Sequence, residues 1–363
     1  MAAPWLTEGL IAGEPGRFPP DTAQGRRPIR LNRNENAYGA SDKVIAGMRD
    51  AVSSATRYPD FAREDLQSRI AGLHGVTTEQ VVLGCGSGEI LRMAVDAFLE
   101  SKKKVVVAQP TFELIGQYAR RLGTEVVAIP LNKDYSHDLN AMRARSDATT
   151  GLVYICNPNN PTGTLTRRSD LETIVRSLPP TTRVVVDEAY HHYVGKSADY
   201  ASFLDRPLED SRVIVVRTFS KIYGLAGLRI GYAICEPRTA RLLALHQLSD
   251  DVNGVAVKAA LAALDDVDHV RVSASRNVDD RQEFFNQANA RMLRVIDSQT
   301  NFVMVNTGRP AVEIGEHFRK HDILIGPRFP AFDHYIRVSL GTPTDMREFW
   351  RVWDLMPGHK MSM

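Results

Sequence analysis

Residues 213–234 read VIVVRTFSKIYGLAGLRIGYAI, and their pattern identifies the fold class that the rest of the chain repeats. Two apolar runs, 213–216 and 230–234, flank a polar segment that contains Lys221 and Arg229. Both runs are apolar throughout rather than alternating, as is typical of strands in a sheet that is covered on both faces. A lysine at the end of such a strand is costly unless it is exposed, paired or used covalently. Taken alone, a surface lysine and an arginine in an ion pair would be the commoner interpretation.

Apolar runs of the same kind recur along the chain, with helical patterns between many of them. This alternation predicts an α/β fold, a three-layer α/β/α large domain built on a mostly parallel sheet. Towards the C-terminus, strands and helices alternate over a short span, which predicts a smaller α+β domain. The other expected strands are residues 105–107, 126–129, 152–155, 184–186, 302–305, 323–325 and 335–338. The expected helices are residues 43–55, 63–73, 89–99, 238–248, 255–264, 311–321 and 344–355.

The sequence divides into three expected segments. Residues 1–40 are expected to form an N-terminal arm, residues 41–265 the large domain, and residues 266–363 the small C-terminal domain. The first 30 residues are rich in Pro, Gly and Arg and lack clear periodicity, which favours an extended arm. We expect this arm to pack near the small domain.

The composition argues against several classes of function. With 363 residues, of which 43% are hydrophobic and 24% charged, the chain has an ordinary globular composition. Its 45 Lys and Arg residues balance 43 Asp and Glu residues, so a nucleic-acid-binding face is not expected. Three scattered cysteines, Cys85, Cys156 and Cys235, fit neither a disulfide framework nor a zinc site, and no metal is expected. Without a basic leader or an apolar run of membrane-spanning length, the chain is expected to be a cytoplasmic protein with no membrane partner.

A carboxylate closes the apolar run in VVVDEAY, residues 184–190. The run brings Asp187 to the end of a buried strand, where an unpaired charge would be expensive. A protonated pyridine nitrogen is one partner that would compensate for this burial, and a metal ion is another. An aspartate that caps a helix is the common structural alternative.

Two further strings also carry candidate binding residues. Residues 156–163 read CNPNNPTG, in which two prolines and a glycine fix a turn that can aim Asn160 at a ligand. Residues 84–89 read GCGSGE, a glycine-rich loop that opens a helix and offers backbone amides and the Ser87 hydroxyl to a phosphate. Each string alone is a weak signal, because ordinary turns and loops use the same residues.

The four strings occur in the order phosphate loop, asparagine turn, buried carboxylate and lysine–arginine pair, each at the end of a strand. In the order of these strings and in their residues, the chain resembles the fold-type I pyridoxal-phosphate enzymes, the aspartate-aminotransferase-like superfamily. The resemblance runs from about Leu31 to Leu355. Within that superfamily it looks most like the histidinol-phosphate aminotransferase group. The strings LNRNEN (31–36), RYPD (57–60) and IRVSLGT (336–342) carry this closer resemblance.

The resemblance implies pyridoxal 5'-phosphate as cofactor and Lys221, Asp187 and Tyr190 as catalytic residues. Lys221 would carry the cofactor covalently and then shuttle the substrate proton. Asp187 would hold the ring nitrogen protonated, so that the ring can act as an electron sink. Asn160 and Tyr190 would contact the phenolic oxygen of the ring, and Phe112 would stack on its face. The residues that would bind the phosphate are Ser87, Gly88, Ser220, Arg229 and Tyr58, the last from a neighbouring subunit of a homodimer.

The resemblance also implies transamination. The amino group would move between histidinol phosphate, or a related aromatic or other L-amino acid, and a 2-oxo acid such as 2-oxoglutarate. The residues that would bind the substrate are Arg337, Asn36 and Arg328. Relatives commonly carry an arginine directly after the glycine that corresponds to Gly326, whereas here Pro327 separates Gly326 from Arg328.

Two other features bear on the substrate, and two alternative functions stay open. Residues 12–16, AGEPG, contain no tyrosine, although histidinol-phosphate aminotransferases often carry one in this arm. His191 and His192 follow Tyr190, and a histidine pair on a loop is more often solvated or structural than ligand-binding. The alternatives are a pyridoxal-phosphate-dependent oxidase, cyclase or eliminating lyase of specialised amino-acid biosynthesis, and a ligand-sensing protein that reuses the fold.

Overall fold

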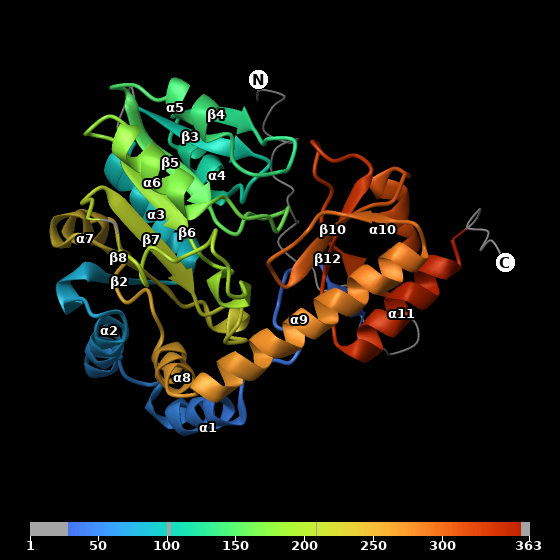
Figure 1. Ribbon diagram of the computed structural model, residues 1–363. Coiled ribbons are helices and arrows are strands. Elements are labelled where there is room, and N and C mark those ends of the chain that lie inside the picture. Colours follow the sequence, from blue (N-terminus) through green and yellow to red (C-terminus); the bar gives the residue numbers. More distant parts are fainter. Residues whose placement is uncertain (1–27, 100–102, 208, 357–363) are drawn as a thin grey trace, which may run out of the picture.

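The long helix α9 (Val267–Ala290) connects two bodies of unequal size in the computed structural model, which describes residues 28–99, 103–207 and 209–356. The larger body holds a seven-stranded sheet between helices, and the smaller body is built mainly from the C-terminal part of the described chain (Figure 1). The predicted α/β fold with a mostly parallel sheet is confirmed. We propose that the boundary between the large and the small domain lies near residue 266, where α9 begins.

The large sheet is parallel except for one strand. Its order is β2-β8-β7-β6-β5-β3-β4, and β8 is antiparallel to both of its neighbours, β2 and β7. The strands from β7 to β4 pair in parallel, so their carboxyl ends meet at one edge of the sheet. The seven strands are β2 (Val81–Gly84), β3 (Lys104–Gln109), β4 (Glu125–Pro130), β5 (Thr150–Cys156), β6 (Arg183–Asp187), β7 (Val213–Thr218) and β8 (Gly231–Cys235).

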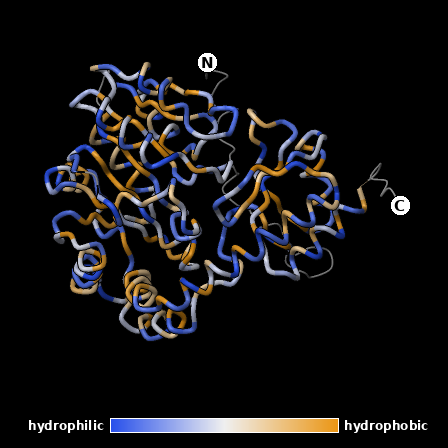
Figure 2. The backbone as a smooth tube through the Cα atoms, in the orientation of Figure 1, coloured by the Kyte–Doolittle hydropathy of each residue, from blue (hydrophilic) through white to orange (hydrophobic). Residues whose placement is uncertain are grey.

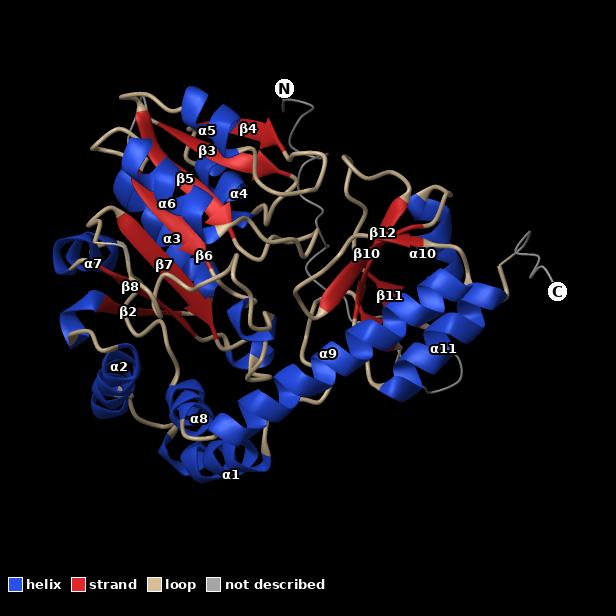
Figure 3. Cartoon of the chain, in the orientation of Figure 1, coloured by secondary structure: helices blue, strands red, loops and turns tan. Residues whose placement is uncertain are grey.

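Alternate residues of the central strands pack into two hydrophobic cores, one on each face of the sheet. Val184 and Val186 of β6 belong to one core, and Val185 between them belongs to the other. Figure 2 shows hydrophobic strands at the centre of the larger body, and Figure 3 shows the helices that cover them. The first core includes α1 (Asp42–Ala51), α2 (Asp60–His74), α5 (Leu139–Ala144), α6 (Arg168–Ser177) and α8 (Gly254–Leu264). The second includes α3 (Ser87–Phe98), α4 (Leu114–Arg121) and α7 (Pro237–Ala244).

The smaller body combines an antiparallel sheet with a separate pair of parallel strands. The antiparallel sheet contains β9 (Arg294–Val295), β10 (Phe302–Asn306) and β12 (Tyr335–Ser339). The parallel pair is β1 (Ile29–Leu31) with β11 (Ile323–Ile325), and α9, α10 (Ala311–Lys320) and α11 (Pro343–Asp354) complete the core. Because β1 pairs with β11, this end of the expected N-terminal arm lies on the smaller body. Residues 1–27 of that arm, including 12–16, lie outside the described residues.

The sequence patterns do not predict β2 or α9. β2 is only four residues long, and α9 lacks a continuous apolar stripe, because Ser273, Asn277 and Arg281 are among the residues that it buries. A helix that buries polar side chains shows no apolar period of 3.6 residues, so its sequence resembles that of a solvated segment.

Other boundaries differ from the expected ones by a few residues. The strand expected at 230–234 is β8, which begins at Gly231 and runs antiparallel to its neighbours. The helix expected at 238–248 ends at Ala244, and the helix expected at 43–55 is α-helical only to Ala51. Short 3-10 turns are η2 (Val52–Ser54), η3 (Thr78–Gln80), η4 (His191–Tyr193) and η5 (Ala226–Leu228). Within the ranges that the structure describes, no helix is both long and apolar enough to cross a membrane.

Candidate active site

Polar side chains gather at the carboxyl edge of the large sheet. Asp187 is the last residue of β6, Asn160 follows β5, and Lys221 follows β7. Phe112 follows β3, one strand further along the sheet. Open parallel sheets bind their ligands at this edge. Arg337, on β12 of the smaller body, reaches the same place, because its Nη1 donates to the side-chain oxygen of Asn160 over 2.7 Å.

Asp187 is a buried carboxylate that forms no ion pair within the described residues. Only 2% of its surface is exposed. The Tyr154 hydroxyl donates to Oδ2 over 2.9 Å, and the Ala189 backbone amide donates to Oδ1 over 3.1 Å. Burial nevertheless raises the pKa of Asp187 to about 6, although these hydrogen bonds act in the opposite direction. The site therefore contains a negative charge that the protein stabilises incompletely.

The Tyr190 hydroxyl receives hydrogen bonds from two side-chain amides. Nδ2 of Asn34 donates to it over 3.0 Å, and Nδ2 of Asn160 donates over 3.4 Å. Because the hydroxyl oxygen accepts from both amides, its own hydrogen can be donated to a third group. The ring packs edge-to-face against Phe302 at a centroid distance of 5.0 Å, which restricts its orientation.

Lys221 is half-buried, and its amine faces two main-chain carbonyls. Nζ donates to the carbonyl oxygens of Arg33 and Asn34, each over 3.1 Å. Burial, followed by repulsion from Arg337, lowers the pKa of Lys221 to about 7. An amine with this pKa is partly neutral near pH 7, so it can accept a proton as a base.

Arg337 is a buried arginine whose guanidinium is only partly used. Its Nη2 donates to the carbonyl oxygen of Asn32 over 2.8 Å, while Nε has no partner among the described residues. The rings of Phe302 and Phe329 lie 5.6 Å and 5.4 Å from the guanidinium carbon. Burial lowers the pKa of Arg337 to about 10, so the side chain stays cationic at neutral pH. A planar, charged donor of this kind suits a carboxylate or a phosphate.

The glycine-rich loop lies against Arg229. α3 begins with Ser87 and Gly88, directly after Gly86, whose φ of 75° is left-handed. This conformation favours a glycine, and the backbone of Gly86 lies directly against the guanidinium of Arg229. Nη1 of Arg229 also donates to the Ser220 hydroxyl over 3.3 Å. The first turn of α3, the serine hydroxyls and the guanidinium together form a surface suited to an anion.

Two of the predicted site residues have other contacts in this single chain, and a third is largely exposed. Nδ2 of Asn36 donates to the carbonyl oxygen of Ile222 over 2.8 Å, which ties the Asn36 loop to the segment after Lys221. Arg328 is exposed and pairs with Asp333 over 2.7 Å. Tyr58 is 74% exposed. In the described part of the chain, no contact joins Tyr58 or Arg328 to the residues around Lys221.

Sequence reasoning missed two residues that contact the predicted ones directly. Tyr154 lies within the apolar strand β5 and donates to Asp187. A signal was available, because a tyrosine in a fully buried strand needs a partner for its hydroxyl. Asn34 contacts both Lys221 and Tyr190, which are 187 and 156 positions away in the sequence, and no local pattern indicates such contacts.

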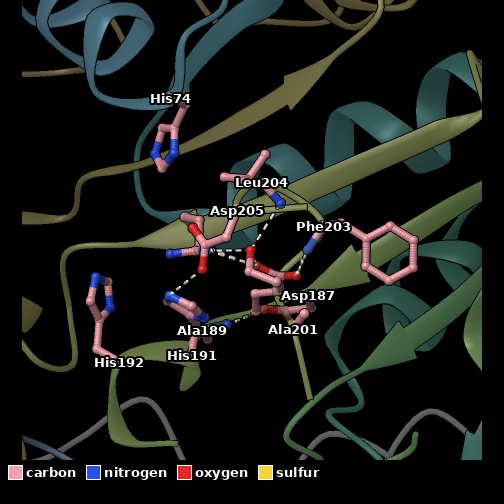
Figure 4. Close-up of polar contacts among 12 residues, drawn as sticks. His74, Asp187, Ala189, His191, His192, Ala201, Phe203, Leu204 and Asp205 are labelled. Carbon is pink, nitrogen blue, oxygen red and sulfur yellow. Dashed lines mark hydrogen bonds and ion pairs between the residues drawn. The ribbon is translucent and has the colours of Figure 1, made fainter. Parts of the chain in front are cut away.

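A second polar cluster surrounds Glu188, the residue after the buried carboxylate in the sequence. Glu188 is itself buried and accepts from Nε of Arg217 over 2.9 Å. Figure 4 shows His191 pointing toward Asp205, at 3.7 Å, with His192 nearby. Burial lowers the pKa of both histidines, so their rings are neutral at pH 7. Their contacts with protein groups suit the structural interpretation of the pair.

Comparison with known proteins identifies the family of this chain. The profile of the family Aminotransferase class I and II matches residues 26–352. A histidinol-phosphate aminotransferase from Symbiobacterium thermophilum is 36% identical over 325 residues, which cover 88% of this chain and 88% of that protein. The chain belongs to the class I and II aminotransferases.

Solved structures agree with this membership. A putative histidinol-phosphate aminotransferase from Erwinia carotovora atroseptica has a TM-score of 0.85 at 32% identity, over 89% of this aminotransferase and 94% of that chain. The histidinol-phosphate aminotransferase from Sinorhizobium meliloti, in complex with pyridoxal-5'-phosphate, has a TM-score of 0.84 at 28% identity, over 92% and 93%. Members of this family depend on pyridoxal phosphate, and so does this aminotransferase. The resemblance seen in the sequence is confirmed.

The residues of the site fit this cofactor. Asp187 is a buried anion without a cation, as a protonated ring nitrogen requires. The surface formed by Ser87, Ser220 and Arg229 offers donors to a phosphate. The donor set therefore matches an aromatic base that carries a phosphate.

The buried carboxylate predicts a pH-dependent stability of the cofactor-free aminotransferase. Because folding raises the pKa of Asp187 to about 6, the folded state loses stability as the pH rises from roughly 4, the usual carboxyl pKa, through 6. Asp187→Asn removes this cost with little change of shape. At pH 7 we expect the cofactor-free variant to be more stable by on the order of 2–3 kcal/mol, and the difference should vanish near pH 4. Chemical denaturation across this pH range measures it.

Asp268→Asn on the exposed surface of α9 is the matched control. It should change the free energy of unfolding by less than about 0.5 kcal/mol at every pH. If the Asp187→Asn variant were less stable than the parent at pH 7, the protein would be stabilising the charge and the argument from burial would be wrong.

Proposed function

We propose that this aminotransferase moves the amino group of histidinol phosphate, or of a related aromatic or other L-amino acid, to a 2-oxo acid such as 2-oxoglutarate. The main observation that supports this proposal is the state of the Lys221 amine. Its pKa is lowered to about 7, and its nitrogen lies 5.5 Å from the ring centroid of Tyr190. The names of the relatives support histidinol phosphate as the donor. We also propose the cytoplasm as its location, as the composition suggests.

The proposed roles at the ring follow from the contacts of Asp187 and Tyr190. When bound, pyridoxal phosphate delocalises the electron pair that is left when the α-proton of an amino substrate is removed. Asp187 would pair with the ring nitrogen, where its negative charge favours the protonated form. Tyr190, which has a hydrogen left to donate, and Asn160 would contact the phenolic oxygen. Phe112 would cover one face of the ring.

Lys221 is the proposed proton carrier. It would hold the cofactor covalently in the resting enzyme and be released when an amino substrate takes its place. Because burial and Arg337 lower the pKa of its amine, much of the released Lys221 would be neutral and able to take the proton from the substrate Cα. Positioned proton transfer of this kind is typically worth on the order of 10² to 10⁴ in rate.

The phosphate of the cofactor is the proposed ligand of the surface at the start of α3. Its residues are Ser87, Gly88, Ser220 and Arg229. A bidentate arginine and the amides of a helix N-terminus would fix the position of the phosphate and, with it, the orientation of the ring. This anchoring holds the reacting atoms close to Lys221, which lowers the entropic cost of the reaction.

We propose a homodimer in which Tyr58 completes the phosphate site of the partner subunit. Tyr58 is 74% exposed, and the nearby Phe61 and Val52 are 85% and 63% exposed, so a second copy would cover an apolar surface. Sedimentation equilibrium should give twice the chain mass of 40.4 kDa. A monomer at micromolar concentration would contradict the shared site.

Arg337, Asn36 and Arg328 are the proposed substrate contacts. Arg337 offers its unpartnered Nε and its buried charge to an anionic group of the substrate. Arg328 becomes available when its exposed pair with Asp333 opens, and such pairs contribute only about 0–1 kcal/mol. Arg328 is the candidate for the substrate phosphate, since it lies on an exposed loop at the end of β11.

The covalent role of Lys221 can be tested by reduction. Borohydride should leave a pyridoxyl group on the peptide that contains residue 221, because reduction makes the link between lysine and cofactor permanent, and mass spectrometry detects it. Lys221→Ala should lose both the adduct and transamination. Lys43→Ala, at an exposed lysine of α1, is the control and should keep both. An adduct on another lysine, or an active Lys221→Ala variant, would show that the assignment is wrong.

The donor can be identified by measuring glutamate formation from 2-oxoglutarate. Among histidinol phosphate, aromatic amino acids and arginine, we expect the highest kcat/KM with histidinol phosphate, and one glutamate for each keto product. Ammonia release or oxygen consumption without an acceptor would contradict transamination and favour the lyase or oxidase alternatives.

Two arginine variants locate the substrate anion in the same assay. Arg337→Gln removes a buried charge-assisted contact, so KM should rise roughly 10- to 100-fold. Arg328→Gln should raise KM for histidinol phosphate but leave KM unchanged for donors without a phosphate. Equal effects on both classes of donor would rule out Arg328 as the phosphate contact.

A further inference from the structure

Three consecutive main-chain carbonyls face the two cationic side chains of the site. The carbonyl oxygen of Asn32 accepts from Nη2 of Arg337 over 2.8 Å, and those of Arg33 and Asn34 both accept from Nζ of Lys221 over 3.1 Å. These residues come directly after β1, where the chain leaves the smaller body. One short segment therefore contacts the amine from the large sheet and the guanidinium from the small sheet.

The backbone of Asn34 makes this arrangement possible. Its φ of 54° is left-handed, a conformation that costs most residues energy and that asparagine tolerates better than other non-glycine residues. Ser339, at the end of β12, accepts from the Asn34 backbone amide over 2.8 Å. Nδ2 of Asn301 donates to the Asn34 carbonyl oxygen over 3.1 Å. A strained conformation that is held from two sides by buried partners is typical of a functional site.

The side chain of Asn34 has a separate set of contacts. Its Oδ1 accepts from the Ser339 hydroxyl over 2.9 Å, so Nδ2 is the end that faces Tyr190 and donates to its hydroxyl. Asn34 is 2% exposed, and these contacts are therefore shielded from water. One residue thus contacts Lys221 through its backbone and Tyr190 through its side chain.

Two carbonyls can orient the amine of Lys221 when it is neutral, although carbonyl acceptors by themselves favour the ammonium. A neutral lysine has two N–H hydrogens and one lone pair, and the carbonyls of Arg33 and Asn34 can accept both hydrogens. The lone pair then points away from the carbonyls and is free to accept a proton. Among the described residues, Nζ has these two acceptors, so the third hydrogen of an ammonium would have no acceptor there. Burial and the charge of Arg337 oppose this preference and lower the pKa of Lys221, so the amine is partly neutral near pH 7.

We propose that Asn34 is a positioning residue for transamination: its left-handed backbone holds the free amine of Lys221 by two carbonyls, and its side-chain amide fixes the Tyr190 hydroxyl. The inference rests on the proposed roles of Lys221 and Tyr190. It adds that one residue of the N-terminal segment orients both groups. The amine of Lys221, once released, would therefore stay close to the Tyr190 hydroxyl and to the cofactor ring that this hydroxyl would contact.

Two substitutions separate the backbone contribution from that of the side chain. Asn34→Gly keeps the left-handed backbone and its carbonyls but loses the amide that faces Tyr190. Asn34→Ala loses the amide and also disfavours the left-handed conformation. Tyr190→Phe and the Asn34→Gly/Tyr190→Phe double variant complete a cycle for the side-chain contact. Asp322→Ala, at another left-handed residue (φ 59°), controls for a general cost of this backbone change.

The first measurement is the rate at which cofactor-free enzyme takes up pyridoxal phosphate, followed by visible absorbance. Capture requires the neutral amine of Lys221, so Asn34→Ala should load roughly tenfold more slowly than the parent. Asn34→Gly and Asp322→Ala should load at close to the parental rate. If Asn34→Gly were as slow as Asn34→Ala, or if Asn34→Ala loaded like the parent, the backbone part of the inference would be refuted.

The second measurement is the visible absorption band of the loaded enzyme. Asn34→Gly should shift this band in the same direction as Tyr190→Phe, and the double variant should show no further shift, because the amide acts through the hydroxyl. Additive shifts would refute the side-chain part. Circular dichroism confirms that each variant is folded, and a purely structural role would change thermal stability without this pattern of loading and absorption.

The two proposals fail in different ways. If Lys221 does not carry the cofactor, the parent enzyme itself shows no pyridoxyl adduct at residue 221 after reduction. If the parent shows that adduct while all Asn34 variants load and absorb as it does, the function of Lys221 stands and only the role of Asn34 is refuted.

Discussion

The exclusion of water from one carboxylate governs the chemistry of this site. β6 is apolar between its first residue, Arg183, and its last, and its neighbours β5 and β7 flank it on both sides, so the strand carries Asp187 to the sheet edge inside the protein. Tyr154 and a backbone amide satisfy its oxygens, yet burial still raises its pKa. A cationic partner reverses that balance. We propose the protonated ring nitrogen of pyridoxal phosphate as this partner, so that the desolvation of Asp187 as well as its charge would contribute to the affinity for the cofactor.

The same low-dielectric surroundings tune the two cations. Lys221 and Arg337 come from different sheets and repel each other, and both lose part of their hydration on burial. Lys221 is brought toward neutrality, whereas Arg337 stays charged because its intrinsic pKa is much higher. Lys221 can therefore exchange a proton near neutral pH, while Arg337 has the charge that binding an anion would require.

Buried polar side chains of α9 hold the turn at residues 300–301, which in turn contacts Asn34. Asn277 and Arg281 both donate to the carbonyl oxygen of Thr300, over 3.1 Å and 3.2 Å. The next residue, Asn301, donates to the carbonyl oxygen of Asn34, whose other contacts reach Lys221 and Tyr190. At these positions α9 buries polar rather than apolar side chains, and they bind the main chain of a buried turn. These buried hydrogen bonds restrict the geometry of the turn, although the side-chain oxygen of Asn301 has no partner among the described residues.

The sequence alone determined the family, the fold class and the residues that stand at strand ends. Lys221, Asp187 and Asn160 could be found because each follows a continuous apolar run, and such runs are read locally from burial and periodicity. Tertiary structure alone decided how these residues are held. The contact of Arg337 with Asn160 spans 177 positions, that of Lys221 with Asn34 spans 187, and α9 buries polar groups that look solvated in the sequence. Hydrogen bonds between distant polar groups leave no periodic trace, because their partners are chosen by the packing of two bodies rather than by neighbours along the chain.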